Sequence, residues 1–130
     1  MIIDTSALLA ILRDEPEALS CARAIEEAEV RRMSAGNMLE AAIVIDASGD
    51  PVASRRLDEL IEVAGIIIEP VTAEQARIGR EAYRDFGRGR GHPAQLNFGD
   101  CFAYALAKTT GETLLFKGQD FSHTDLRPAS

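Results

Sequence analysis

The sequence predicts an α/β fold, in which a central, mostly parallel β-sheet is flanked by helices on both faces. Apolar runs rich in β-branched residues, at residues 1–3, 66–68 and 113–116, predict buried strands. Longer amphipathic segments, such as residues 51–64, separate these runs and predict helices. Because strands that alternate with helices usually pair in parallel, the two kinds of segment together indicate a three-layer α/β domain.

Residues typical of caps, turns and breaks define where each predicted helix and strand begins and ends. The first helix begins at Thr5 or Ser6, either of which is a suitable N-cap. A short strand at residues 30–34 and a turn lead into a third helix, which ends at the Gly49-Asp50-Pro51 break. The segment 87–93 is too rich in Gly and Pro for a helix or strand and predicts a loop. The expected helices are residues 6–13, 16–28, 38–48, 51–64, 73–86 and 97–110, and a short edge strand is expected near residues 125–126.

Length and composition fit one globular domain over residues 1–130. Hydrophobic residues make up 46% of the chain and charged residues 27%. No apolar run approaches the ~20 residues that a membrane span needs, and nothing marks the N-terminus for export, so we expect a cytoplasmic protein with no membrane partner. Cys21 and Cys101 are expected to be reduced. The net charge of −7 argues against broad, non-specific nucleic-acid binding but allows a local basic patch.

Four acidic residues occupy similar places in the predicted fold. Asp4 ends the first strand, and Asp120 follows the last strand. Glu40 and Asp100 are expected in the first turns of two helices. Strand ends and helix starts share one edge of a parallel sheet, so we expect all four side chains to meet in one pocket. Taken singly, Glu40 and Asp100 have a structural explanation, because Asn37 to Glu40 and Asn97 to Asp100 both fit capping boxes. The functional hypothesis therefore depends on the whole set.

Clustered carboxylates favour a bound cation. Two carboxylates about 5 Å apart repel each other by roughly 3 kcal/mol at an effective dielectric constant of about 20. Four of them at neutral pH therefore take up protons or bind a metal ion. Oxygen ligands without His or Cys suit Mg²⁺ or Mn²⁺ rather than Zn²⁺, and such ions promote phosphodiester hydrolysis. His92 and His123 lack ligand spacing, and the sequence contains no Walker loop or Ser-His-Asp pattern.

Basic residues concentrate just before the last predicted helix. We expect Arg84, Arg88 and Arg90 to contact nucleic-acid phosphates near the acidic pocket. For Arg77 and Arg80, which precede them at helical spacing, a solvated helix face is an equal alternative.

Four motifs follow one another along the chain: the opening Ile3-Asp4-Thr5-Ser6-Ala7-Leu8, the helix with Glu40, the run Leu96-Asn97-Phe98-Gly99-Asp100-Cys101-Phe102-Ala103, and the run Leu114-Leu115-Phe116-Lys117-Gly118-Gln119-Asp120-Phe121 with Thr124-Asp125. In this order and spacing, they resemble the PIN-domain ribonuclease toxins of VapBC type (VapC-like) over nearly the whole chain. The resemblance implies four catalytic acids, namely Asp4, Glu40, Asp100 and Asp120. It also implies metal ligation by Asp4, Asp100 and Asp120, with supporting polar groups at Thr5, Ser6, Asn97 and Asp125. Asp125 lies close enough in sequence to replace or assist Asp120.

The family resemblance also implies a fold, an activity and partners. The fold is a three-layer PIN-like domain. The activity is that of a type II toxin, a Mg²⁺- or Mn²⁺-dependent endoribonuclease that inhibits translation. The partners are an RNA substrate, a second copy of the chain in a homodimer, and a cognate VapB-like antitoxin that places an Arg in the acidic pocket.

Three other hypotheses stay open on the sequence alone. A PIN nuclease acting on DNA or flap substrates would share the acidic pocket. A non-catalytic PIN-like module would keep metal and bind RNA or a partner without cleaving it. A receiver-like phosphoacceptor requires paired acids after the first strand and an acceptor Asp on a central strand, and neither is evident here.

Overall fold

The computed structural model describes residues 1–89 and 91–129. Within these ranges the chain forms four strands and six helices, which alternate as the sequence predicts. The strands are β1 (Ile2–Ile3), β2 (Arg32–Ser34), β3 (Ile67–Glu69) and β4 (Leu114–Leu115). The helices are α1 (Thr5–Leu12), α2 (Ala18–Glu27), α3 (Ala35–Asp46), α4 (Pro51–Val63), α5 (Ala73–Phe86) and α6 (Phe98–Thr110).

All strand pairs are parallel, and the order across the sheet is β3-β2-β1-β4. In β1, Ile2 is in register with Arg32 on one side and Leu114 on the other. The chain therefore leaves β1 towards β2 on one side and returns to β4 on the other. The carboxyl end of β1 lies at this reversal of direction, where open α/β sheets bind ligands.

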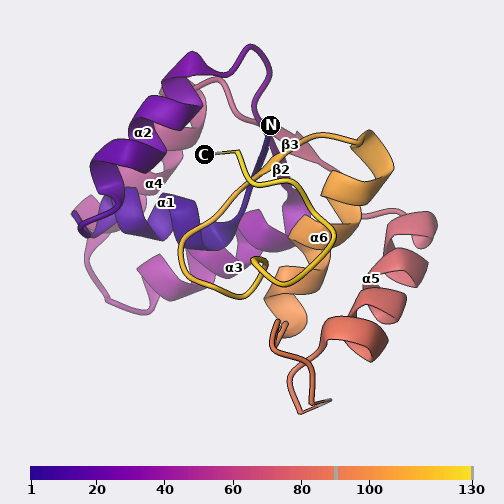
Figure 1. Cartoon of the computed structure of the whole chain (residues 1–130). Helices are drawn as coiled ribbons and strands as arrows, with labels where there is room; N and C mark the ends of the chain where they lie inside the picture. The colour runs from indigo at the N-terminus through magenta and orange to yellow at the C-terminus, as the bar shows by residue number, and fades with distance from the viewer. Residues whose placement is uncertain (90, 130) are drawn as a thin grey trace.

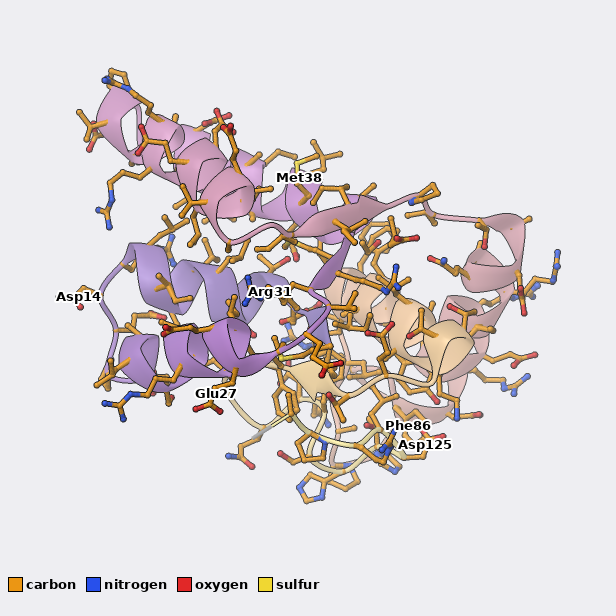
Figure 2. The ribbon with its side chains drawn as sticks, turned by 90° about the horizontal axis from the view of Figure 1, so that it is seen from above. Asp14, Glu27, Arg31, Met38, Phe86 and Asp125 are labelled. Carbon is orange, nitrogen blue, oxygen red and sulfur yellow. The ribbon has the colours of Figure 1, made fainter. Side chains whose placement is uncertain are left out.

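Two hydrophobic cores lie on opposite faces of the sheet. Successive strand residues point to opposite faces, so Ile3 and Leu115 join one core while Ile2 and Leu114 join the other. The first core is completed by α1 to α4, and the second by α5 and α6. The three layers are visible in Figure 1. Figure 2, seen from above, places α1, α2 and α4 on one side and α5 and α6, with Phe86 and Asp125, on the other.

Two helix starts differ from the sequence prediction. The predicted turn before α3 is absent, because the Ser34 hydroxyl at the end of β2 already caps the helix by accepting from Gly36 N at 3.2 Å. Glu40 consequently lies in the second turn of α3, and the predicted capping box at its start is wrong. The cap of α1 is Asp4 rather than Thr5 or Ser6.

The chain's final segment also differs from the prediction. Residues 125–126 form no strand, and the expected edge pairing is instead a single parallel bridge between Leu114 and Pro128. Across the described ranges, no helix is long and apolar enough to cross a membrane.

Candidate active site

Asp4 stands at the junction of β1 and α1 and is only 4% exposed. Its backbone N–H continues the sheet by donating to Leu115 O at 3.0 Å. Its side chain caps α1, with Oδ2 accepting from Ser6 N at 3.1 Å and from Ser6 Oγ at 2.6 Å. The strand end and the helix cap together fix this carboxylate at the carboxyl edge of the sheet.

The Ser6 hydroxyl also connects Asp4 to the segment after β4. Ser6 Oγ, which donates to Asp4, also accepts from Lys117 N at 2.9 Å. One hydroxyl therefore joins the carboxylate of β1 to the loop that carries Asp120. The Lys117 side chain reaches the segment between α1 and α2, where its Nζ donates to Glu15 Oε1 at 3.0 Å.

Glu40 is positioned by the close approach of α3 to α6. A Cβ atom at Gly99 would overlap the Glu40 carboxylate, so only glycine leaves room for it there. Asn37, fully buried one turn earlier in α3, donates from Nδ2 to Gly99 O at 2.9 Å. Asn37 O in turn accepts from Thr5 Oγ1 at 3.1 Å, which connects α3 to the start of α1.

Asp100 lies in the first turn of α6, as predicted. Asn97 Oδ1 accepts from Asp100 N at 2.9 Å, and Asp100 Oδ2 accepts from Asn97 N at 3.0 Å. The predicted capping box at Asn97 is therefore confirmed. This reciprocal pair fixes the Asp100 carboxylate at the positive end of the helix dipole.

The four predicted acids line one cavity of ≈ 200 Å³. Thr5, Ser6 and Asn97, which the sequence analysis placed around the acids, line the same cavity, as does Lys117. Asp125 lies elsewhere: its carboxylate accepts from Tyr104 Oη and from Lys108 Nζ, both at 2.7 Å. Of the two acids in the C-terminal segment, Asp120 is the one that faces the other acids.

Burial and mutual repulsion make two of these acids hold their protons tightly. Burial, assisted by the negative charge of Glu40 and opposed by the bonds from Ser6, raises the pKa of Asp4 from 3.8 to about 6. Burial also raises the pKa of Asp100 from 3.8 to about 8. The bond from Asn97 opposes that rise, whereas the charge of Asp4 and the adjacent Asp120 side chain add to it. With all four acids ionised, the cavity would hold more negative charge than its surroundings neutralise.

The donor set fits a hard divalent ion. The cavity supplies carboxylate, hydroxyl and amide oxygens, and its lining contains neither His nor Cys. Within residues 1–89 and 91–129, no three His, Cys, Asp or Glu side chains are arranged so that they could hold one metal ion together. In proteins, Mg²⁺ commonly uses one or two carboxylates and completes its shell with water and substrate oxygens.

The predicted RNA-binding arginines lie near the end of α5 and the loop after it. Arg84 is exposed and pairs with the neighbouring Asp85, with Nε 3.1 Å from Oδ1. Arg88 lies at the start of the loop and lines a groove between α5 and α6. Arg90 lies outside the described residues.

Sequence reasoning missed two parts of the site. Asn37 was interpreted as a helix cap, but it is a buried residue that joins α3 to α6 and α1. No local pattern distinguishes such an Asn from a cap, because its partners are distant in sequence. Lys117 was left in a polar tail, although the Lys-Gly pair directly after a strand end was a positional signal.

Comparisons with known proteins agree with this geometry. The PIN domain family matches residues 1–126. The chain is 60% identical over 129 residues to Ribonuclease VapC28 of Mycobacterium tuberculosis, covering 99% of this chain and 97% of that protein. It is 50% identical over 129 residues to Ribonuclease VapC42 of the same species, with coverage of 99% and 98%.

Solved structures share the fold at low sequence identity. The crystal structure of Mycobacterium tuberculosis VapC20, a Sarcin-Ricin loop cleaving toxin, matches with a TM-score of 0.71 and 18% identity over 98% of both chains. A toxin–antitoxin complex from Klebsiella pneumoniae contains a chain that matches with a TM-score of 0.69 and 14% identity, covering 95% of this chain and 92% of that one. The family match and the close relatives together show that the chain belongs to the PIN-domain family, among the VapC ribonuclease toxins of toxin–antitoxin systems.

Proposed function

We propose that this ribonuclease hydrolyses RNA phosphodiester bonds with Mg²⁺ or Mn²⁺ held by Asp4, Asp100 and Asp120, with Glu40 as the fourth catalytic acid. The observation that carries the proposal is the convergence of these acids, from four separate segments, on one cavity. The raised pKa values of Asp4 and Asp100 support it, since a cation would relieve their unmatched charge. When bound, such an ion activates water and neutralises charge that develops on the phosphate.

The chain's own residues prepare the carboxylates for this task. The hydrogen bonds that orient Asp4 fall on Oδ2, and so does the bond from Asn97 to Asp100. Each carboxylate can therefore present Oδ1 to an ion while its orientation is fixed by the helix cap. Asn37 keeps α3 against α6 and thereby fixes Glu40 opposite Asp100. Fixed ligands of this kind lower the reorganisation needed when the substrate phosphate arrives.

Arg84, Arg88 and Arg90 supply the basic surface for the RNA backbone in this proposal. Replacing Arg88 and Arg90 together with alanine should weaken RNA affinity and flatten its dependence on salt, because fewer counterions are released on binding. Fluorescence anisotropy over a series of salt concentrations measures both. An unchanged salt slope would assign these arginines to a solvated loop.

The remaining features of the proposal concern assembly and cellular context. We propose that residues 1–130 act as one PIN-like domain, that two copies form a homodimer, and that a cognate VapB-like antitoxin neutralises the toxin. An antitoxin Arg entering the acidic cavity would match its charge. Inhibition of translation through RNA cleavage would take place in the cytoplasm.

The test is cleavage of total cellular RNA by antitoxin-free protein in Mg²⁺, in Mn²⁺ and in EDTA. Asp100→Asn should abolish cleavage but keep the fold, because the amide oxygen can still accept from Asn97 N. Asp120→Asn should do the same. Asp125→Asn is the matched control, since it makes the same chemical change at an acid held by Tyr104 and Lys108.

The outcomes separate the candidate mechanisms. Discrete fragments that require a divalent ion and disappear in Asp100→Asn and Asp120→Asn, but not in Asp125→Asn, would support the assignment. Full activity in folded Asp100→Asn protein would refute it. Parallel reactions on DNA of matched sequence test whether the nuclease distinguishes RNA from DNA.

A further inference from the structure

A second and larger concavity lies between α5 and α6, beside the acidic cavity. Its volume is ≈ 660 Å³, and its lining is mainly apolar. Three aromatic side chains contribute to it, namely Tyr83, Phe98 and Phe102. The catalytic proposal uses none of these rings.

Phe98 is the exposed member of this set. It is 76% exposed, although exposing a large aromatic side chain to water is unfavourable. Its ring is supported edge-to-face by Phe102, with ring centroids 5.0 Å apart and planes at 79°. Phe102 is itself held against α3, where a Cβ atom at Gly36 would lie 2.6 Å from its ring. The Phe98 ring therefore packs against Phe102 on one side, and the rest of the ring is exposed to solvent.

The groove and the acidic cavity share one lining residue, Asn97. This residue lines both concavities, and Phe98 follows it directly at the start of α6. Asp100 lies only two residues further along the same helical turn. Residues two apart on a helix point to different sides, so Phe98 faces the groove while Asp100 faces the acidic cavity, and an RNA chain that crosses Asn97 would meet both.

Basic side chains line the same groove. Arg80 and Arg88 contribute to its wall, and in the described part of the chain neither forms an ion pair with an acidic side chain. Unpaired arginines beside an exposed aromatic ring are the combination that binds single-stranded nucleic acid, through phosphate contacts and base stacking. In a chain of net charge −7, their placement beside the acidic cavity favours an anionic occupant.

We propose that the groove between α5 and α6 binds an unpaired nucleobase of the RNA, next to the cleaved phosphate, with Phe98 as the stacking surface. The proposal rests on the ribonuclease function and adds a base-binding subsite to it. Base stacking on an aromatic ring tolerates any base, so the subsite selects unpaired RNA rather than one sequence.

The test measures binding in EDTA, so that it does not depend on metal or on cleavage. Fluorescein-labelled oligouridylate and a labelled abasic oligonucleotide of equal length serve as probes in fluorescence anisotropy. The wild-type protein is compared with Phe98→Ala and Phe98→Tyr. Val63→Ala is the control, because Val63 is an exposed apolar residue at 85% exposure on α4. Sedimentation velocity reports the oligomeric state of each variant.

We expect the wild-type protein and Val63→Ala to prefer the base-containing probe by roughly tenfold or more, as stacking on one ring allows. Phe98→Ala should lose that preference while its affinity for the abasic probe stays the same, and Phe98→Tyr should keep it. A preference that survives in Phe98→Ala would overturn the proposal. So would a change from dimer to monomer in Phe98→Ala, which would assign the groove to contact between copies of the chain. Because cleavage is not measured, a failure of the metal hypothesis would leave this result interpretable.

Discussion

Replacing Asp4 with Asn should make the metal-free protein more stable while it removes activity. Asn can still cap α1, because its amide oxygen accepts from Ser6 N as Asp4 Oδ2 does. The substitution removes only a buried negative charge beside Glu40 and Asp100. In most proteins the loss of a buried, hydrogen-bonded group is destabilising, so a gain would be specific to an electrostatically strained site.

The magnitude follows from the pKa of Asp4. Its rise from 3.8 to about 6 means that the folded state holds the proton more tightly than the unfolded state. Stability of the wild-type protein should therefore fall as pH rises from about 4 to about 6, and stay lowered above that. A rise of roughly two pKa units corresponds to about 3 kcal/mol. For a chain of 130 residues, that is a difference of about 10 °C in Tm.

The assay is thermal unfolding of wild-type and Asp4→Asn protein in EDTA, across pH 4 to pH 8. The two proteins should have similar Tm values at pH 4, where Asp4 is protonated in the folded state. Asp4→Asn should become the more stable protein as pH rises to about 6. Adding Mg²⁺ or Mn²⁺ at pH 8 should then stabilise the wild-type protein more than the variant. A constant difference across the pH range, or a less stable variant at pH 8, would refute the reasoning.

Two further substitutions test how the site is built. Gly99→Ala should force the Glu40 carboxylate away and reduce cleavage by roughly 100-fold. Single-turnover kinetics on one RNA measure this loss, and an unchanged rate would show that the position of Glu40 does not depend on Gly99. Ser6→Ala removes the hydroxyl that joins the Asp4 carboxylate to Lys117 N, and it should lower the free energy of unfolding by about 1–3 kcal/mol as well as the cleavage rate. Normal cleavage by Ser6→Ala would show that the helix-cap bond alone orients Asp4.

The sequence predicted best those elements whose limits are determined by residues close to them in the chain. The helix expected at residues 73–86 is α5 (Ala73–Phe86), because Thr72 and the Gly-rich loop bound it on both sides. The parallel sheet followed from the alternation of strands and helices, and the structure confirms it. The start of α3 was wrong because Ser34 and Asn37 are equally good caps by composition. Only the length of β2, fixed by its pairing with β1 and β3, decides between them.

The convergence of the four acids was predictable for the same reason as the fold. Strand ends and helix starts of a parallel sheet share one edge, so topology alone brings Asp4, Asp100 and Asp120 together. The supports of these acids were not predictable. The bond from Asn37 to Gly99 O spans 62 residues, and the bond from Lys117 N to Ser6 spans 111. Such pairings depend on how closely two helices or loops approach, which no local pattern encodes.

The unmatched charge in the cavity also connects the metal to the antitoxin. A divalent ion and an antitoxin Arg would each lower the same repulsion among Asp4, Glu40 and Asp100, so they should compete for the cavity. Affinity for the cognate antitoxin should then fall as Mg²⁺ concentration rises, and by linkage bound antitoxin should weaken metal binding by the same factor.

Isothermal titration calorimetry at constant ionic strength, with Na⁺ replacing Mg²⁺ in the control, separates this competition from general screening. Asp125→Asn should show the same dependence on Mg²⁺ as the wild-type protein, because Asp125 is paired outside the cavity. Antitoxin affinity that does not depend on Mg²⁺ would mean that the antitoxin neutralises the toxin without entering the acidic cavity.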